Sequence, residues 1–313
     1  MDKYKHSGKP GRLKGRGKLC QAILAAAANF RRWRRNPQIV MAFCLAFILC
    51  FLLSDKVIRF SERHDTLLQL AEPFIWTFGD AVSVLVISLI LLLAFSDMPN
   101  LGNEVPFFLI RMNRRIWMLG QILYLLSATM IFMVFILVST WILTGSRAYL
   151  ANLWSETAAI LGYSKIGSEL YIPSFVKVME LSFPYESMLH IFGLMLGYGV
   201  LMASLILHLN LWKDNGGVIG GIVFSGFGIV LNPGLIADWF GISMERMKVA
   251  NILFGWISPL NHATYYMHNF GYDNLPRLWT SYVFFGAGSM IVFILSMIRI
   301  KKYAFQFTGT GKG

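Results

Sequence analysis

Charged side chains are scarce in this sequence of 313 residues. Asp, Glu, Lys and Arg make up only 14% of the chain, whereas 56% of the residues are apolar. Soluble proteins carry roughly 25% charged residues, and one core cannot bury this much apolar surface. The composition therefore excludes an ordinary soluble domain and predicts an integral membrane protein whose surplus apolar surface faces lipid.

Cysteine is rare as well, with Cys20, Cys44 and Cys50 the three copies in the chain. None falls in a segment expected outside the cell, and no CxxC or Cys/His metal spacing is present. His262 and His268, six residues apart, are a poor match to a metal motif. We therefore expect no disulfide framework and no metal centre.

Catalytic motifs are missing too. The sequence has no GxSxG and no HExxH, and the terminal run 309–313 lacks the spacing of a phosphate loop. We expect no catalytic residues and no bound cofactor in this chain. If the protein uses ATP with Mg²⁺, a partner chain must bind them.

Long apolar runs are what the sequence does contain. Six of them approach or exceed the roughly 20 residues that cross a bilayer; they cover residues 38–53, 74–95, 116–143, 188–212, 218–240 and 279–298. The fold class is thus an all-α polytopic membrane protein with about six transmembrane helices. We divide the chain into a disordered basic tail (1–18), an interfacial amphipathic helix (19–36), a transmembrane domain (37–300) and a second tail (301–313).

Lys and Arg predict the orientation. With the N-terminus inside, the inner segments hold 19 Lys and Arg and four acids, whereas the outer segments hold nine basic residues and eleven acids. Cytoplasmic flanks are enriched in Lys and Arg. We therefore expect a multi-pass protein of the cell membrane with both termini in the cytoplasm. No aromatic platform or nucleic-acid-binding fold accompanies the basic tail, so nucleic acid is not an expected partner.

The segment before the first span has helical periodicity. Leu19, Ile23, Ala27, Phe30 and Trp33 recur at spacings of three and four, which places them on one face. We predict a helix lying in the inner leaflet, with Pro37 ending it. Its anchor to lipid phosphates would be a basic and aromatic cluster at its end: Phe30, Arg31, Arg32, Trp33, Arg34 and Arg35.

The inner loop between the second and third spans predicts a short cytoplasmic helix over about 104–115. Asn103 can cap it, and Pro106 is tolerated in a first turn. Bulky apolar residues in so short a loop need a partner surface or the membrane. A plain interfacial anchor for the third span is the alternative.

Three further features concern the spans themselves. Residues 213–217 are too short a connection for the fourth and fifth spans to be anything but antiparallel neighbours, which their glycines allow to approach closely. Asn232-Pro233-Gly234 should kink or unwind the end of the fifth span. Asp80, inside the second span, is either a residue near the outer headgroups or a possible part of a substrate path.

This arrangement resembles the permease subunits of bacterial type-2 ABC exporters. The similarity rests on the amphipathic lead-in helix, the loop helix after the second span and long outer segments after the third and fifth spans. More narrowly, Ser96-Asp97 with Arg111, Arg114, Trp117, Gly120 and Gln121 looks like poorly characterised permeases of Gram-positive bacteria.

The resemblance implies a mechanism in which another subunit hydrolyses ATP. The loop helix would be a coupling helix that docks on an ABC ATPase, and a second permease copy or a homologous permease would complete the pathway. The residues implied in coupling are Pro106, Phe107, Phe108, Leu109, Arg111, Arg114 and Arg115. The substrate would be a peptide, an antibiotic or a lipid-like compound.

Two other functions compete with the exporter. One is a membrane-bound interaction or immunity protein that binds a peptide and transports nothing. The other is an intramembrane enzyme, for which the sequence offers no evident nucleophile with a base. Membrane lipids are expected partners in every case.

Overall fold

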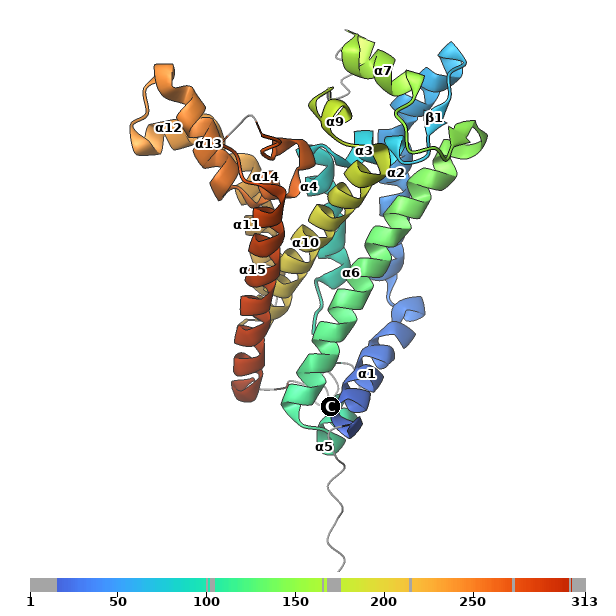
Figure 1. Ribbon diagram of the computed structural model, residues 1–313. Helices are drawn as coiled ribbons and strands as arrows, with labels where there is room; N and C mark the ends of the chain where they lie inside the picture. The colour runs from blue at the N-terminus through green and yellow to red at the C-terminus, as the bar shows by residue number, and fades with distance from the viewer. Residues whose placement is uncertain are drawn as a thin grey trace, which may run out of the picture.

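The computed structural model describes residues 16–99, 101, 105–164, 166–167, 176–213, 216–271, 274–303 and 305. Nearly all of this is helical, and long helices run side by side from one end of the molecule to the other (Figure 1). The predicted basic tail 1–18 lies almost entirely outside the described residues, as does most of the second tail.

The elements follow one another in the order of their labels in Figure 1. The α-helices are α1 (Arg16–Arg31), α2 (Pro37–His64), α3 (Glu72–Phe78), α4 (Ala81–Phe95), α5 (Val105–Arg111), α6 (Arg114–Thr144), α7 (Glu156–Tyr163), α9 (Val176–Leu181), α10 (Pro184–Asn210), α11 (Gly216–Val230), α12 (Pro233–Phe240), α13 (Met247–Ile257), α14 (Pro259–Ala263) and α15 (Leu278–Arg299). Short 3-10 helices are η1 (Trp33–Arg35), η2 (Gly145–Arg147), η3 (Met244–Arg246), η4 (Tyr265–Met267) and η5 (Ile300–Lys302), and two strands are β1 (Leu68–Gln69) and β2 (Ala148–Tyr149).

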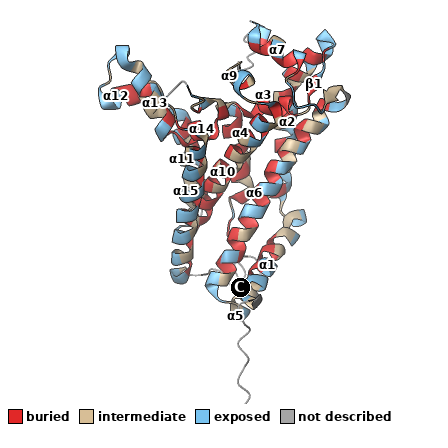
Figure 2. Cartoon of the chain, in the orientation of Figure 1, coloured by how far each residue is buried: buried red, intermediate tan, exposed pale blue. Residues whose placement is uncertain are grey.

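In the part of the chain that the structure describes, four helices are long and apolar enough to cross a membrane: α2, α6, α10 and α15. Two bent pairs, α3 with α4 and α11 with α12, raise the number to as many as six if each pair counts as one span. Large apolar side chains are exposed along these helices, such as Leu52 at 60% and Ile291 at 59%. Figure 2 shows burial concentrated on the inward faces. The described part of the chain is thus almost entirely helical, with four to six candidate membrane spans, as expected of a membrane protein.

The first span is much longer than predicted. Hydropathy ends it near residue 53 because Asp55, Lys56 and Arg59 follow, but α2 continues to His64. Arg59 and Asp55 form an i,i+4 ion pair at 2.8 Å on the surface of this extension. The charged turns therefore extend the helix beyond its apolar part rather than terminating it.

The second span is broken, which the sequence analysis did not predict. The axes of α3 and α4 differ by 86° at Gly79 and Asp80, where a single span over 74–95 was expected. The Asp80 carboxylate accepts a hydrogen bond from the Val82 backbone N–H at 3.0 Å, so Asp80 is the N-cap of α4. The apolar run is continuous in composition but changes direction at a capping residue.

The predicted relationship between the fourth and fifth spans is confirmed. α10 and α11 are packed neighbours, and the Gly217 backbone N–H donates to Asn210 Oδ1 at 2.7 Å. A Cβ at Gly217 would collide with the Ile206 carbonyl oxygen, so only glycine permits this approach. The break predicted at Asn232-Pro233-Gly234 is also present, with an 84° bend between α11 and α12.

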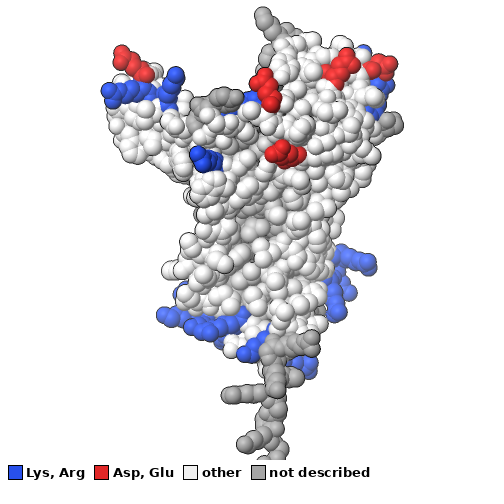
Figure 3. All heavy atoms as spheres, viewed as in Figure 1, with Lys and Arg blue, Asp and Glu red and all other residues white. Residues whose placement is uncertain are grey.

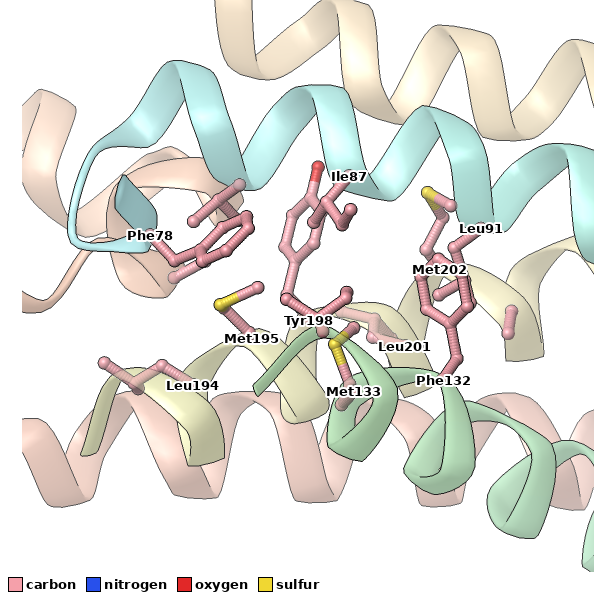
Figure 4. Close-up of a cluster of buried hydrophobic side chains, with 14 of the residues drawn as sticks. Phe78, Ile87, Leu91, Phe132, Met133, Leu194, Met195, Tyr198, Leu201 and Met202 are labelled. Carbon is pink, nitrogen blue, oxygen red and sulfur yellow. The ribbon is translucent and has the colours of Figure 1, made fainter. Parts of the chain in front are cut away.

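The core lies where α4, α6 and α10 meet, with α15 beside them. Figure 4 shows its centre, in which Tyr198 and Met202 of α10 face Ile87 and Leu91 of α4. Methionines and branched aliphatic residues fill this core, which suits irregular gaps between crossing helices. α12 and α13 carry a separate small core of Leu231, Ile236, Ala237 and Ala250, and the hairpin they form projects from the bundle (Figure 1).

α1 packs along α6. A Cβ at Gly120 of α6 would lie 2.7 Å from the Ala25 Cβ and 2.8 Å from the Ala22 carbonyl oxygen. Asn29 Nδ2 donates to Gln121 Oε1 at 2.9 Å in the same interface. The helix ends at Arg31 rather than at the predicted residue 36. On the predicted apolar face Leu19 and Ile23 are exposed, whereas Phe30 and Trp33 at its end are partly buried. α1 is therefore a helix with a packed small-residue face and a free apolar face.

The two ends of the bundle differ in charge, as Figure 3 shows. We call the end that carries α1, α5 and η5 the basic end and the opposite end the loop end. The described elements at the basic end carry one acid, Asp97, and the following basic residues: Arg16, Lys18, Arg31, Arg32, Arg34, Arg35, Arg111, Arg114, Arg115, Lys213, Arg299, Lys301 and Lys302. At the loop end, β1 and β2 pair in parallel, and buried Glu72 accepts hydrogen bonds from the Ser155 backbone N–H (2.7 Å) and hydroxyl (2.5 Å).

Candidate functional site

The basic end contains the short loop helix that the sequence predicts, but the helix is shorter. α5 ends at Arg111, whereas the prediction extended it to residue 115; Asn103 and Glu104 lie outside the described residues. Asn113 Oδ1 accepts from the Arg115 backbone N–H at 3.2 Å and so caps α6. Arg114 and Arg115 therefore belong to the first turn of α6, because a second capping residue separates them from α5.

The residues of α5 divide between the protein core and the surface. Phe108 and Leu109 are partly buried against the main core, while Ile110 is 82% exposed and Arg111 is exposed. Pro106 is partly buried, and the Phe107 side chain lies outside the described residues. The helix is thus held to its own chain on one side and presents an apolar and basic tip on the other.

Arg114 joins the start of α6 to the end of α15. Its Nη1 donates to the carbonyl oxygens of Tyr303 at 3.0 Å and Lys301 at 3.3 Å. Its guanidinium lies 5.1 Å from the centre of the Phe305 ring, within the range of a cation–π contact. This predicted coupling residue therefore makes its contacts inside the chain.

The predicted N-terminal anchor is a compact aromatic cluster with arginines around it. Trp33 Nε1 donates to the Tyr124 hydroxyl at 2.9 Å, and the Phe30 ring lies 4.9 Å from that of Tyr124. Arg31, Arg34 and Arg35 are exposed, and Arg32 is partly buried. The aromatic residues fix the turn between α1 and α2 on α6, which leaves the exposed arginines available to lipid headgroups.

A cavity of about 830 Å³ lies between α6, α10 and α15. We call it the α6–α15 groove. Leu119, Ile122 and Leu126 line it from α6, and Gly193 and Gly197 line it from α10. α15 supplies a longer apolar wall: Phe285, Gly286, Met290, Phe293, Ile294, Met297 and Ile298. Arg115 and Lys301 line the groove at the basic end, and Tyr282 lines it at the loop end.

Tyr282 also lines a second cavity, of about 600 Å³, at the loop end. His190, Asn269 and Arg277 contribute to that cavity. His190 Nδ1 lies 3.0 Å from the Tyr282 hydroxyl, and its ring stacks on Tyr265 with centroids 5.6 Å apart. The Tyr282–His190 pair thus stands between the groove and the loop-end cavity.

Asp80, the possible pathway residue of the sequence analysis, lines neither of these cavities. Besides capping α4, it accepts a hydrogen bond from the Tyr266 hydroxyl at 2.9 Å. Its position is therefore at a helix break, and not two turns inside a continuous span. These contacts favour the structural interpretation of this carboxylate.

A buried hydroxyl–imidazole cluster escaped the sequence analysis. The Ser281 hydroxyl lies 2.7 Å from both His262 Nδ1 and His268 Nε2. The other nitrogen of each ring meets a backbone carbonyl, Trp256 O at 3.0 Å and Tyr265 O at 2.9 Å. The separation of 19 and 13 residues hides this association in the sequence, and only the fold of α14 and η4 onto α15 creates it.

Burial disfavours the charged form of both imidazoles in this cluster. It lowers the pKa of His268 to about 4 and lowers that of His262. All three side chains are essentially inaccessible, and none lines either cavity. The cluster ties the loop-end segment to α15. Within the described part of the chain, no group of three or more His, Cys, Asp or Glu residues could hold a metal ion.

Comparisons with known proteins give no relative: no family model matches the chain, and neither a curated protein nor a solved structure does.

Proposed function

We propose that the chain is the membrane-spanning permease subunit of an ATP-driven exporter, in which a separate ATPase subunit binds ATP and Mg²⁺. One observation carries the proposal. α5 lies at the basic end between two membrane-length segments, held to the core by Phe108 and Leu109, and presents Ile110 and Arg111 outward. An exposed apolar side chain beside a cation on so short a helix fits docking onto a partner protein.

The contacts of α5 supply a route from that partner to the groove. A force on α5 passes through the Asn113 turn to α6, whose first residue, Arg114, binds the backbone after α15. α6 and α15 are two walls of the α6–α15 groove. Closure of a partner ATPase would therefore shift the groove walls as rigid bodies.

The proposal places the basic end in the cytoplasm of a cell membrane, since Lys and Arg favour that side. Both termini are then cytoplasmic, and a second permease copy or a homologous permease completes the transport path. The groove has the size and apolar character of small-molecule sites. A peptide, an antibiotic or a lipid-like compound remains the proposed class of substrate.

Co-expression with an ATPase tests the proposal. The partner to try is any phosphate-loop ATPase whose reading frame adjoins that of this chain, and on this proposal it should co-purify with the full chain in detergent. Ile110→Glu with Arg111→Glu should abolish the association while the chain still inserts in the membrane. Lys302→Glu is the matched control, because it reverses an exposed charge at the same end outside α5.

Two results would contradict the proposal. One is that no ATPase associates with the wild-type chain under any nucleotide condition. The other is that the α5 variant and the Lys302 variant retain the ATPase equally. Either result would show that α5 is not the docking site of an ATPase on this chain.

The projecting α12–α13 hairpin favours a second candidate, a membrane protein that binds a peptide without transport. Trp239 is 66% exposed, Phe240 62% and Met244 84%. Exposed aromatic and methionine side chains suit a binding surface as well as a membrane interface. If this candidate is right, deletion of residues 233–257 would abolish binding of the peptide and any immunity to it. The deletion would leave the association with any ATPase unchanged.

A further inference from the structure

We propose that the α6–α15 groove is a binding site for an anionic phospholipid of the leaflet at the basic end, with an acyl chain between α6 and α15 and the phosphate at Arg115 and Lys301. Lipid binding at this site requires neither an ATPase nor transport. The proposed exporter mechanism requires only that the groove change shape, whereas the present proposal names the molecule that the groove binds.

The groove has the dimensions of an extended chain. Its lining on α15 runs from Tyr282 to Ile298, a length of roughly 24 Å at about 1.5 Å per residue. The hydrocarbon core of a bilayer is about 30 Å thick, so one leaflet is about 15 Å deep and the groove is long enough to hold an acyl chain of that leaflet. Apart from the two basic residues, the wall residues are apolar, glycine, Ser289 or Tyr282.

Glycine residues in the walls keep the groove open, because they have no side chains to fill it. A Cβ at Gly286 would have no heavy atom within 4 Å, so this position opens onto empty space. At Gly197 a Cβ would come within 3.0 Å of the Phe285 ring, and at Gly193 within 3.0 Å of the Tyr282 hydroxyl. Larger residues at these positions would narrow the groove or displace its aromatic wall.

Charge selects the kind of lipid. Arg115 and Lys301 line the groove, and both side chains are exposed. Asp97, the described acid at this end, lines a different cavity beside Arg32 and Tyr124. Two cations at the membrane surface attract a phosphate group, and among the described residues no carboxylate lines the groove beside them. Each cation near an anionic surface contributes to binding.

The same charges disfavour a second copy of this chain in the groove. Copies inserted in one membrane share one orientation, because the distribution of Lys and Arg determines it. The basic end of the neighbour would then lie at the level of Arg115 and Lys301. Like charges at one level repel, whereas a lipid phosphate neutralises them.

Native mass spectrometry of the full purified chain tests the site. The probes are phosphatidylglycerol and phosphatidylcholine with identical acyl chains, and soluble glycerol phosphate is the competitor. Wild-type chain should retain phosphatidylglycerol in preference, and glycerol phosphate alone should neither bind nor displace it. Arg115→Gln with Lys301→Gln should weaken retention on the order of tenfold, while Lys18→Gln with Lys302→Gln, which removes two exposed charges at the same end, should not.

The acyl chain has its own test. Gly286→Phe fills the groove and should reduce phosphatidylglycerol retention at unchanged charge. Gly226→Phe, at a position on α11 that also has nothing within 4 Å, is the matched control. In the wild-type chain, phosphatidylglycerol with a photoreactive group on its acyl chain should label Ile122 and Met290 in preference to the exposed Ile222 and Val223 of α11.

Three outcomes would overturn the proposal. The first is equal retention of the two lipids by the wild-type chain. The second is equal loss in the Gly286 and Gly226 variants together with uniform photolabelling of α6, α11 and α15. The third is a dimer that Gly286→Phe alone dissociates, since the groove would then hold a second copy.

Discussion

The guanidinium of Arg114 donates a hydrogen bond to the carbonyl oxygen of Tyr303, 3.0 Å away and 189 positions later in the chain. Arg114→Gln should release residues 300–303 from α6. We expect faster hydrogen exchange of the Lys301–Tyr303 amides and a loss of about 1–2 kcal/mol in the free energy of unfolding. Arg111→Gln, a change of an exposed arginine on α5, is the control, and equal exchange in both variants would refute the contact.

Gly120 should tolerate no side chain. Its Cβ position is 2.7 Å from Ala25 Cβ and 2.8 Å from Ala22 O, so Gly120→Val should push α1 off α6 at a cost of about 1–3 kcal/mol. Limited proteolysis should then cut between residues 16 and 36. Gly226→Val, at an open position, should leave the α1 region as resistant as in the wild-type chain.

Two substitutions of Asp80 distinguish a structural role of its carboxylate from a role in transport. Asparagine is an equally good N-cap and can accept from Tyr266, so Asp80→Asn should change thermal stability and any transport very little. Asp80→Ala removes both acceptors and should cost about 1–2 kcal/mol. A transport defect in a stable Asp80→Asn protein would restore the carboxylate as a pathway group.

Two serines of α15 should respond in opposite ways to alanine. Ser281→Ala leaves two buried imidazole nitrogens without their hydroxyl partner, which should cost about 1–3 kcal/mol. The buried Ser289 hydroxyl has no hydrogen-bond partner within the described residues. Ser289→Ala should therefore be neutral or stabilising. Thermal unfolding of both variants in one detergent gives the comparison, and equal melting temperatures would count against the cluster.

Acid should destabilise the loop end through His268. Its pKa is lowered to about 4 in the folded chain from an ordinary value of about 6.5. The unfolded chain therefore binds the proton more readily, and this contribution is complete above about pH 6.5 and is lost as the pH falls towards 4. The loss is on the order of 3 kcal/mol. The melting temperature of His268→Gln should fall less than that of the wild-type chain between pH 7 and pH 4.5; parallel curves would exclude this residue.

Span positions followed from hydropathy where a helix is apolar throughout. α6, α10 and α15 begin and end within four residues of the predicted segments 116–143, 188–212 and 279–298. α2 was predicted too short, because hydropathy stops at Asp55 although charged residues continue a helix outside the membrane. The apolar composition of residues 74–95 does not change at the break between α3 and α4. The signal of this break in the sequence is Asp80, a residue type that caps helices.

The candidate site was less predictable than the fold. The capping argument applied to Asn103 applies equally to Asn113, and following it would have assigned Arg114 and Arg115 to α6. The contacts of Arg114 with Tyr303, and the meeting of Ser281 with His262 and His268, depend on helix packing across long separations in sequence. Periodicity and local motifs carry no information about such contacts.

α6 and α15 diverge from the basic end towards the loop end (Figure 1). Arg114 fastens them where they are close, so any tilt of α15 about that contact would move the far end of the helix most. The 22 residues of α15 span about 33 Å at about 1.5 Å per residue. A tilt of about 10° about this contact would move the far end by about 6 Å on this helix geometry, enough to part Tyr282 from His190 while the basic end hardly moves.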